Sequence, residues 1–580
     1  MHLAILFAVL LLCLFPFTLQ AVERLPLKRK RLILGLLLAN VQFLSLASYG
    51  LSIACFEMYG AVPTLELTKV YSGQIRNLLP QVGMELLLSL VLLVAAWLIL
   101  AWLYSRAAPV LLSSLETIGQ GAPPSSVAGQ GSATLRVGIL LFIGSLFLVY
   151  LPTRRFWFQR EPIHSFWGDA TDTTVLIPEN LRSGRSLGEN AYLAHLGPDV
   201  KPSTPRNLIL ITVDALRSDQ MGVYGADADD TPFLSSLYRI GKLRRIDSAY
   251  SVCTFSFCGI LGTLSSSYWH QLGGSSLVLT DVLSHYGYQT RFLLSGDHTH
   301  FLGLRSFYGS HISEFRDGST TDDAYANDDR IIVPWLQNVT WSSTHGTFLD
   351  IHLMSAHFIG VRQSQFERWK PDTDSFADFL SGVPKSQRYR NRYLNGILQA
   401  DDTIRQIFQV LREKGVLDRA LVIITADHGE YLGEAGWYGH FHEPYEPVSR
   451  IPVLIYDQSA LTYPQRPLSS QVDIAPTFLY AIGVPIPPQW SGIPLQLATT
   501  RNAISIASHE ASGVVAQLGG KRYKYLQMRN SRHEELYELG APDAEENNLA
   551  SQQAAQPTLI QMRAFHQQIL DQNGAGFPQQ

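Results

Sequence analysis

The stretch that decides the fold is Leu421–His442, LVIITADHGEYLGEAGWYGHFH. It opens with an unbroken apolar, β-branched run, Leu421–Thr425, which predicts a buried strand of a parallel sheet with helices on both faces. Asp427 and His428 follow that run. Because open α/β sheets bind ligands beyond the carboxyl ends of their strands, this carboxylate and imidazole predict a functional site. The alternative is an Asp that caps a helix and a histidine on a surface loop.

Three other predicted strands end in the same kinds of side chain. Between residues 206 and 500, apolar runs alternate with helical patterns, which predicts βαβ units and an α/β fold with a mostly parallel, doubly wound sheet. The carboxyl ends of such strands meet at one edge, so groups far apart in the sequence are expected to converge there. The strands predicted at 207–213, 291–294 and 347–353 contribute Asp214, His298, His352 and His357.

Two carboxylates and one imidazole from these strand ends form a candidate metal site. Asp214, Asp427 and His428 offer oxygen and nitrogen ligands. This set suits Zn²⁺ or Mn²⁺, whereas Mg²⁺ and Ca²⁺ fit less well once an imidazole takes part. The sequence has no thiolate cluster of the kind that holds a structural zinc ion. The sequence therefore predicts a divalent metal with a chemical role.

Candidate nucleophiles lie in the segment SVCTFSFCGILGT, residues 251–263. Small and hydroxyl-bearing residues precede an apolar helix there, and a nucleophile at a helix N-terminus gains from free amides and the positive end of the helix dipole. Cys253, Thr254 and Ser256 all have the required chemistry. The alternative role for Thr254 or Ser256 is to cap the helix.

Composition divides the chain into a membrane part and a soluble part. The net charge of −4 gives no indication of nucleic-acid binding, and four cysteines are too few for a disulfide framework. Charged residues make up 16% of the 580 residues and are scarcest before residue 152. We expect a membrane anchor at 1–152, a juxtamembrane linker at 153–205, a catalytic domain at 206–500, and a C-terminal subdomain and tail at 501–580 that includes a terminal helix.

The anchor contains four apolar segments, 3–22, 32–56, 86–104 and 137–151, the last at the lower limit of spanning length. The basic cluster Lys28–Arg31 follows the first segment, and the positive-inside rule places it in the cytoplasm. Four spans then put the chain after Pro152 in the periplasm, as in a bacterial inner-membrane protein. The first segment could alternatively be a cleaved signal peptide. Asn40, inside the second segment, is expected to bond between helices.

Several motifs, in order, resemble the sulfatase family of the alkaline phosphatase superfamily: LITVDALRSDQMGVYG, ITADHGEYLGEAGW, YEPVSRIPVLI and VDIAPTFLYAIGV. The resemblance implies an alkaline phosphatase-like fold, with Asp214, Asp427 and His428 as metal ligands. IHLMSAHF resembles the H-x₄-H motif of membrane phosphoethanolamine transferases, matched by His352 and His357. His440 matches a later histidine of that group, although His442 could replace it.

The nucleophile region departs from the sulfatase pattern. Sulfatases carry C-x-P-S-R, whose first residue becomes formylglycine, whereas this chain has phenylalanine for both Pro and Arg. Ala215 also replaces the second Asp of the usual pair. By register Cys253 ranks first as nucleophile, Thr254 second and Ser256 third. If Cys253 paired with Cys258 in an oxidising compartment, it could not attack.

These observations predict a metal-dependent enzyme that cleaves a sulfate or phosphate ester through a covalent intermediate. His357 and His440 are the expected catalytic histidines, and His298, His352 and Ser256 are expected to contact substrate. One alternative is transfer of phosphoethanolamine or a similar group to an envelope lipid or glycan, with the lipid bilayer as a partner. A second alternative is a non-catalytic lipid sensor.

Overall fold

The computed structural model of the chain describes residues 206–571, apart from gaps at 228, 275, 322–325, 343, 374–377, 379, 500, 530 and 542. Before residue 206 it describes only scattered positions, with 93–103 the longest run. The predicted spans 3–22 and 137–151 lie outside the described residues, as do nearly all of 32–56 and nearly all of the linker 153–205. Among the described helices, none combines the length and hydropathy needed to cross a membrane. Trp97 Nε1 donates to Asn40 Oδ1 at 2.9 Å.

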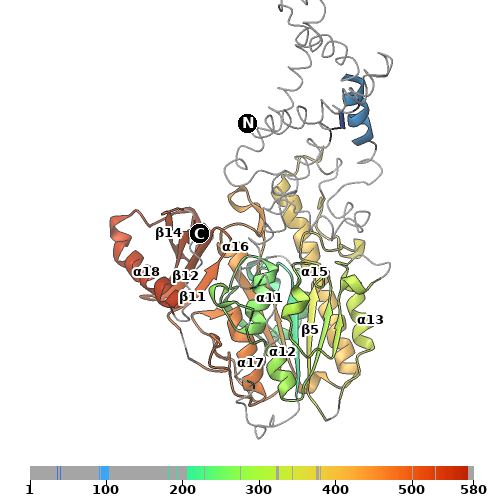
Figure 1. Cartoon of the computed structure of the whole chain (residues 1–580), viewed down its shortest axis with the longest axis vertical. Helices are drawn as coiled ribbons and strands as arrows, with labels where there is room; N and C mark the ends of the chain where they lie inside the picture. Colours follow the sequence, from blue (N-terminus) through green and yellow to red (C-terminus); the bar gives the residue numbers. More distant parts are fainter. Residues whose placement is uncertain are drawn as a thin grey trace, which may run out of the picture. The chain divides into compact units, whose positions relative to one another are not determined.

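An eight-stranded sheet organises the main domain, with its strands in the order β10-β2-β9-β6-β1-β5-β3-β4 (Figure 1). Strands β1, β5, β6, β3 and β4 run parallel, as the apolar runs predict. Strand β9 runs antiparallel between β2 and β6. The sheet is therefore mostly parallel, which confirms the predicted α/β class. The strands are β1 Asn207–Val213, β2 Leu243–Tyr250, β3 Gln289–Leu294, β4 Glu314–Arg316, β5 Thr347–Leu353, β6 Ala420–Thr425, β9 Arg450–Asp457 and β10 Ser469–Ser470.

Helices cover both faces of this sheet. Helices α10 and α13 each contact α15, and α12 and α17 each contact α11. Helices α13 and α15 and the group around α11 are labelled in Figure 1, and this cover explains why β1, β5 and β6 are buried along nearly their whole length. The helices are α10 Pro232–Arg239, α11 Ser256–Ser265, α12 Leu279–His285, α13 Ile332–Gln337, α15 Lys385–Glu413, α16 Glu446–Ser449, α17 Ile474–Ala481 and α18 Gln556–Asp571.

A second, antiparallel sheet follows the main domain. Its strands are β11 Ala503–Ala507, β12 Ala511–Leu518, β13 Lys521–Met528 and β14 Glu534–Leu539, and α18 packs against it. A fully buried lysine, Lys524, ties this sheet to the main domain. Its Nζ lies 2.8 Å from Glu545 Oε1 and 3.1 Å from Glu446 Oε1, and it donates to the Pro444 carbonyl at 2.9 Å. Burying this cation is tolerable because every partner is polar or anionic.

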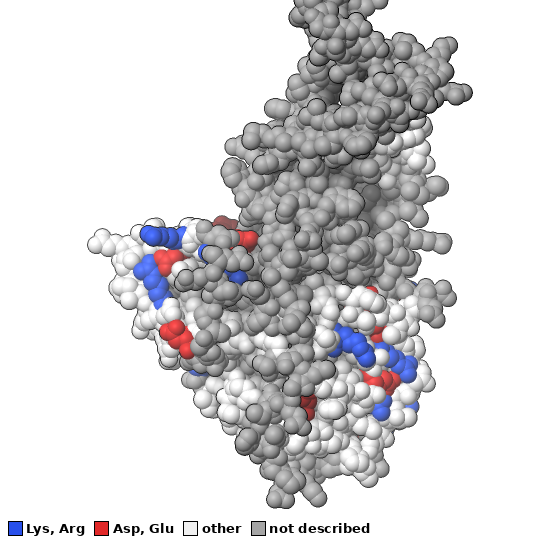
Figure 2. Space-filling view, in the orientation of Figure 1, with Lys and Arg blue, Asp and Glu red and all other residues white. Residues whose placement is uncertain are grey.

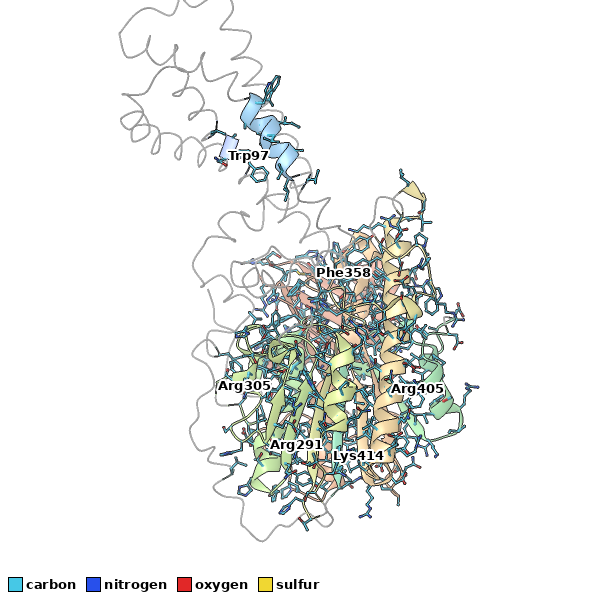
Figure 3. The ribbon with its side chains drawn as sticks, turned by 90° about the vertical axis from the view of Figure 1, so that its right-hand side faces the viewer. Trp97, Arg291, Arg305, Phe358, Arg405 and Lys414 are labelled. Carbon is cyan, nitrogen blue, oxygen red and sulfur yellow. A yellow bond between two sulfur atoms is a disulfide. The ribbon has the colours of Figure 1, made fainter. Side chains whose placement is uncertain are left out.

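The carboxyl edge of the main sheet is the upper end in Figure 3. Phe358, which follows β5, lies at that end, whereas Arg291 near the start of β3 and Lys414 after α15 lie at the other. On the face shown in Figure 2, the described basic side chains lie beside acidic ones and form no single basic patch.

Candidate active site

The predicted metal ligands converge at the carboxyl edge of the sheet. Asp214 follows β1 and Asp427 follows β6, and these strands pair in parallel with Thr212 opposite Thr425. Ligand atoms of Asp214, Asp427 and His428 all lie within 4.8 Å of one another. His428 Nε2 is 3.3 Å from Asp427 Oδ2 and 3.7 Å from Asp214 Oδ1.

These three groups have the chemistry of a cation site. Asp214 Oδ1 and Asp427 Oδ2 are buried, and neither has a hydrogen-bond partner within the described part of the chain. Burial, together with the nearby Asp427 carboxylate, raises the pKa of Asp214 well above its ordinary value. Two buried carboxylates are costly side by side unless a positive charge joins them. A divalent ion would supply that charge, so the residues present fit a metal.

The backbone after β1 orients the Asp427 carboxylate. Ala215 adopts a left-handed conformation, with φ at 61°. Its N–H donates to Asp427 Oδ1 at 3.1 Å, and the N–H of His428 donates to the same oxygen at 3.0 Å. The Oδ1 atom of Asp427 therefore accepts two backbone hydrogen bonds, whereas its Oδ2 atom faces His428 in the cluster. Non-glycine residues rarely adopt this conformation, and they are concentrated at functional sites.

Ser256 is the candidate nucleophile that contacts this cluster. It is the first residue of α11, and its Oγ lies 3.2 Å from His428 Nε2 and 3.5 Å from Asp214 Oδ2. The helix has no side-chain cap, so the capping role considered for Ser256 is wrong. Gly259 allows α11 to approach closely, because a Cβ there would lie 2.2 Å from the Asp427 carbonyl oxygen.

The other two candidates are not in this position. Cys253 and Cys258 form a disulfide across a sequence separation of 5. A disulfide sulfur has no thiolate with which to attack, so the first rank given to Cys253 is wrong for this state of the protein. Thr254 is fully buried, and its Oγ1 has no hydrogen-bond partner among the described residues. Ser256, ranked third from sequence, is therefore the best placed of the three.

Two buried histidines lie on the β3–β5 side of the cluster. His352 Nε2 is 3.3 Å from Asp214 Oδ2, and the His352 ring lies 4.7 Å from the ring of His298. Burial lowers the pKa of His298 to about 3. Both ring nitrogens of His298 have protein partners, Tyr308 Oη at 2.6 Å and the Ser295 carbonyl at 3.1 Å. His298 therefore has no nitrogen left for a substrate, contrary to its predicted role.

His357 and His440 lie on the other side of the cluster. The His440 ring is 4.2 Å from the His428 ring and 5.3 Å from the His357 ring. Burial lowers the pKa of His357 to about 3 and that of His440 well below its ordinary value, so burial favours the neutral form of both imidazoles. His442 instead stacks on Trp437, with ring centroids 4.8 Å apart. Of the two histidines weighed from sequence, His440 is the one beside the cluster.

Glu430 was not among the residues predicted from the sequence. This buried carboxylate accepts a hydrogen bond from His440 Nδ1 at 2.8 Å and another from the Tyr389 hydroxyl at 2.6 Å. The first contact fixes the His440 ring and leaves Nε2 as its free nitrogen. Its position in the sequence could have indicated a role at the site, because Glu430 lies only two residues after the predicted metal ligand His428.

Comparison with known proteins identifies a family for most of the main domain. Residues 206–484 match the family model described as Sulfatase. Among curated proteins, N-acetylglucosamine-6-O-sulfatase of Bacteroides thetaiotaomicron is 34% identical over 114 residues, which cover 19% of this chain and 20% of the relative. The chain thus aligns with about a fifth of that relative's length.

Solved structures also match. BT4656, solved in complex with its substrate D-glucosamine-2-N,6-O-disulfate, has 16% identity and a TM-score of 0.48, over 64% of this chain and 99% of that one. The C-terminal periplasmic domain of EcEptC from Escherichia coli has 16% identity and a TM-score of 0.43, over 53% of this chain and 90% of that one.

The sheet, its carboxyl-edge cluster and the hydroxyl at the start of α11 define an α/β enzyme. The family match makes the class specific: residues 206–484 match the sulfatase family model. This match confirms the resemblance to the sulfatase family seen in the sequence.

Proposed function

We propose that this domain cleaves a sulfate or phosphate ester through a covalent intermediate on Ser256. The observation that carries the proposal is the position of the Ser256 hydroxyl, 3.2 Å from His428 Nε2 and beside two buried carboxylates. Each carboxylate has one oxygen that makes no hydrogen bond to the described residues. Asp214, Asp427 and His428 would hold a divalent ion, with zinc or manganese the best fit to this ligand set. When bound, the ion would lower the pKa of the serine hydroxyl and offset charge on the transferred group.

In the proposed reaction, Ser256 Oγ bonds to the sulfur or phosphorus atom, and the bond from that atom to the alcohol oxygen breaks. The serine proton passes to an imidazole of His357 or His440, and the same imidazole returns it to the departing oxygen. Glu430 stabilises positive charge on His440 during this transfer, because its carboxylate accepts from Nδ1. Water then attacks the serine ester and regenerates the hydroxyl.

A second candidate function is transfer of a phosphate-linked group to another hydroxyl. It is favoured by an unmodified serine at the cluster, with Cys253 held in a disulfide instead of being available for conversion to formylglycine. A serine phosphate ester can be released by water or by an acceptor alcohol held in its place. We propose an envelope lipid or glycan as that acceptor, because the chain has predicted membrane spans.

The test compares full-length protein in detergent with Ser256→Ala and with Thr254→Val as the matched control. Aryl sulfates, aryl phosphates and phosphodiesters serve as substrates, with zinc or manganese added. We expect Ser256→Ala to lose turnover and Thr254→Val to keep it, since only the first hydroxyl contacts the cluster. Mass spectrometry of the quenched wild-type enzyme should find the added group on Ser256. Turnover that survives in Ser256→Ala would refute the assignment.

We further propose that the four apolar segments anchor the chain in a bacterial inner membrane, with the sulfatase domain in the periplasm. Support comes from the position of the basic cluster Lys28–Arg31 and from exposed apolar side chains in the run 93–103, including Leu98, Ile99 and Trp102. Protease added to spheroplasts should digest the region after residue 206. Protection of that region until the membrane is permeabilised would contradict this orientation.

A further inference from the structure

A buried amide connects the nucleophile segment to the metal-ligand loop. Gln471 lies in the single turn Gln471–Asp473 between β10 and α17, and its side chain is fully buried. Its Oε1 accepts from the N–H of Val252 at 3.1 Å. Its Nε2 donates to the carbonyls of Ala426 and Asp427, both at 2.9 Å. One side chain thus joins the segment at Val252 to the segment at Ala426 and Asp427, which lie more than 170 residues apart in the sequence.

The two joined segments carry the reacting groups. Val252 lies four residues before Ser256, and Asp427 is a predicted metal ligand. The Val252 backbone is also held from its other side, because its carbonyl accepts from the N–H of Ala507 at 3.0 Å. The separation between Ser256 and the cluster therefore depends on how far Val252 lies from the carbonyl end of β6.

We propose that Gln471 is a positioning residue that sets the distance between the Ser256 hydroxyl and the cluster of Asp214, Asp427 and His428. The proposal rests on the proposed function of that cluster. An amide side chain suits this position because it can both donate and accept. It donates to the carbonyls of Ala426 and Asp427 and accepts from the N–H of Val252. A carboxylate would satisfy the Val252 N–H but would face two carbonyl oxygens with no proton to share. An apolar side chain would remove the partner that Gln471 gives to the Val252 N–H and to the Asp427 carbonyl.

The experiment compares Gln471→Met and Gln471→Glu with Gln496→Met in the full-length protein. Gln496 is a matched control, since it is also buried and its Nε2 donates to a carbonyl, that of Thr477, at 3.0 Å. We expect kcat of both Gln471 variants to fall by about 100-fold, with KM and metal content little changed, because a shift of about 1 Å in a reacting group costs about that much. The control should keep its kcat, although all three variants lose thermal stability.

A second readout does not depend on turnover. Hydrogen exchange of the peptide covering 250–258 should be faster in Gln471→Met, which lacks the acceptor for the Val252 N–H, than in wild type, and unchanged in the control. Slower or equal exchange there, or a kcat within about 3-fold of wild type, would overturn the positioning role. If the wild-type enzyme cleaves no sulfate or phosphate ester, the proposed function fails, and the exchange measurement still decides whether Gln471 holds the Val252 segment.

Discussion

The disulfide beside Ser256 leads to a prediction that separates the candidate nucleophiles. Cys253→Ala and Cys258→Ala each remove the same bridge, so the two variants should behave alike. If Cys253 were the nucleophile, Cys253→Ala would abolish turnover, and Cys258→Ala would release an active thiol. A nucleophilic Ser256 therefore predicts equal turnover in the two variants, whereas a nucleophilic Cys253 predicts unequal turnover. Comparing the two variants is easier than measuring the size of either loss.

The magnitude follows from the size of the closed loop. For a sequence separation of 5, the chain-entropy relation gives about 2 kcal/mol of stabilisation, equivalent to about 30-fold in an equilibrium constant. The segment is also held by the hydrogen bond from Ser251 N–H to the Ser449 carbonyl at 2.8 Å and by the bond from Val252 to Gln471. We therefore expect kcat to fall by at most about 30-fold in either variant.

The assay measures kcat and thermal unfolding for both variants and for wild type with and without dithiothreitol. Both variants should lose a similar fraction of activity, and the reductant should lower wild-type activity to the same level. Activation by the reductant, or loss of turnover in Cys253→Ala with full activity in Cys258→Ala, would refute the assignment of Ser256 over Cys253.

Three further predictions concern the cluster, its histidines and the C-terminal helix. Asp427→Ala should lose bound zinc or manganese, measured by elemental analysis, and should lose more than about 100-fold in turnover. Glu430→Gln keeps an acceptor for His440 but removes the charge, so kcat should fall by about 100-fold with KM unchanged in steady-state assays; equal kcat would contradict the role of Glu430. Burial lowers the pKa of His270 and His566 to about 4 from 6.5, so between these values the unfolded chain binds protons that the fold excludes. Their contribution to the free energy of unfolding is complete above pH 6.5 and is lost as the pH falls toward 4; urea midpoints near pH 7.5 and near pH 5 should show this loss, and His566→Gln should reduce it.

Periodicity and strand-end chemistry were sufficient to predict the main sheet and the convergence of Asp214, Asp427 and His428 at its edge. An apolar run such as Leu421–Thr425 is stable as a strand that is buried on both faces. The carboxyl end of that strand then determines where Asp427 lies. The antiparallel direction of β9 was not predicted, because an apolar run such as Ile451–Tyr456 is compatible with either direction. The four-stranded C-terminal sheet was anticipated only as a subdomain.

The nucleophile could not be chosen from the sequence, because the choice depends on a covalent bond and a helix start. Register with the sulfatase pattern favoured Cys253, whereas the bridge to Cys258 occupies its sulfur and α11 begins at Ser256. Gln471 gave no sequence signal, since an isolated glutamine before a helix is ordinary. Its role depends on two segments that meet only in the folded chain.

The contact between β11 and the nucleophile segment determines how the protein can be shortened. The family match ends at residue 484, yet Ala507 forms a β-bridge with Cys253, and Lys524 reaches back to Glu446. A fragment cut at that boundary would leave Glu446 without its buried counter-ion, because Lys524 lies beyond it, and would remove the β11 contact behind the segment that precedes Ser256. Any version trimmed for crystallisation or screening should therefore extend through α18, to about Asp571, even though homology alone suggests a stop some ninety residues earlier.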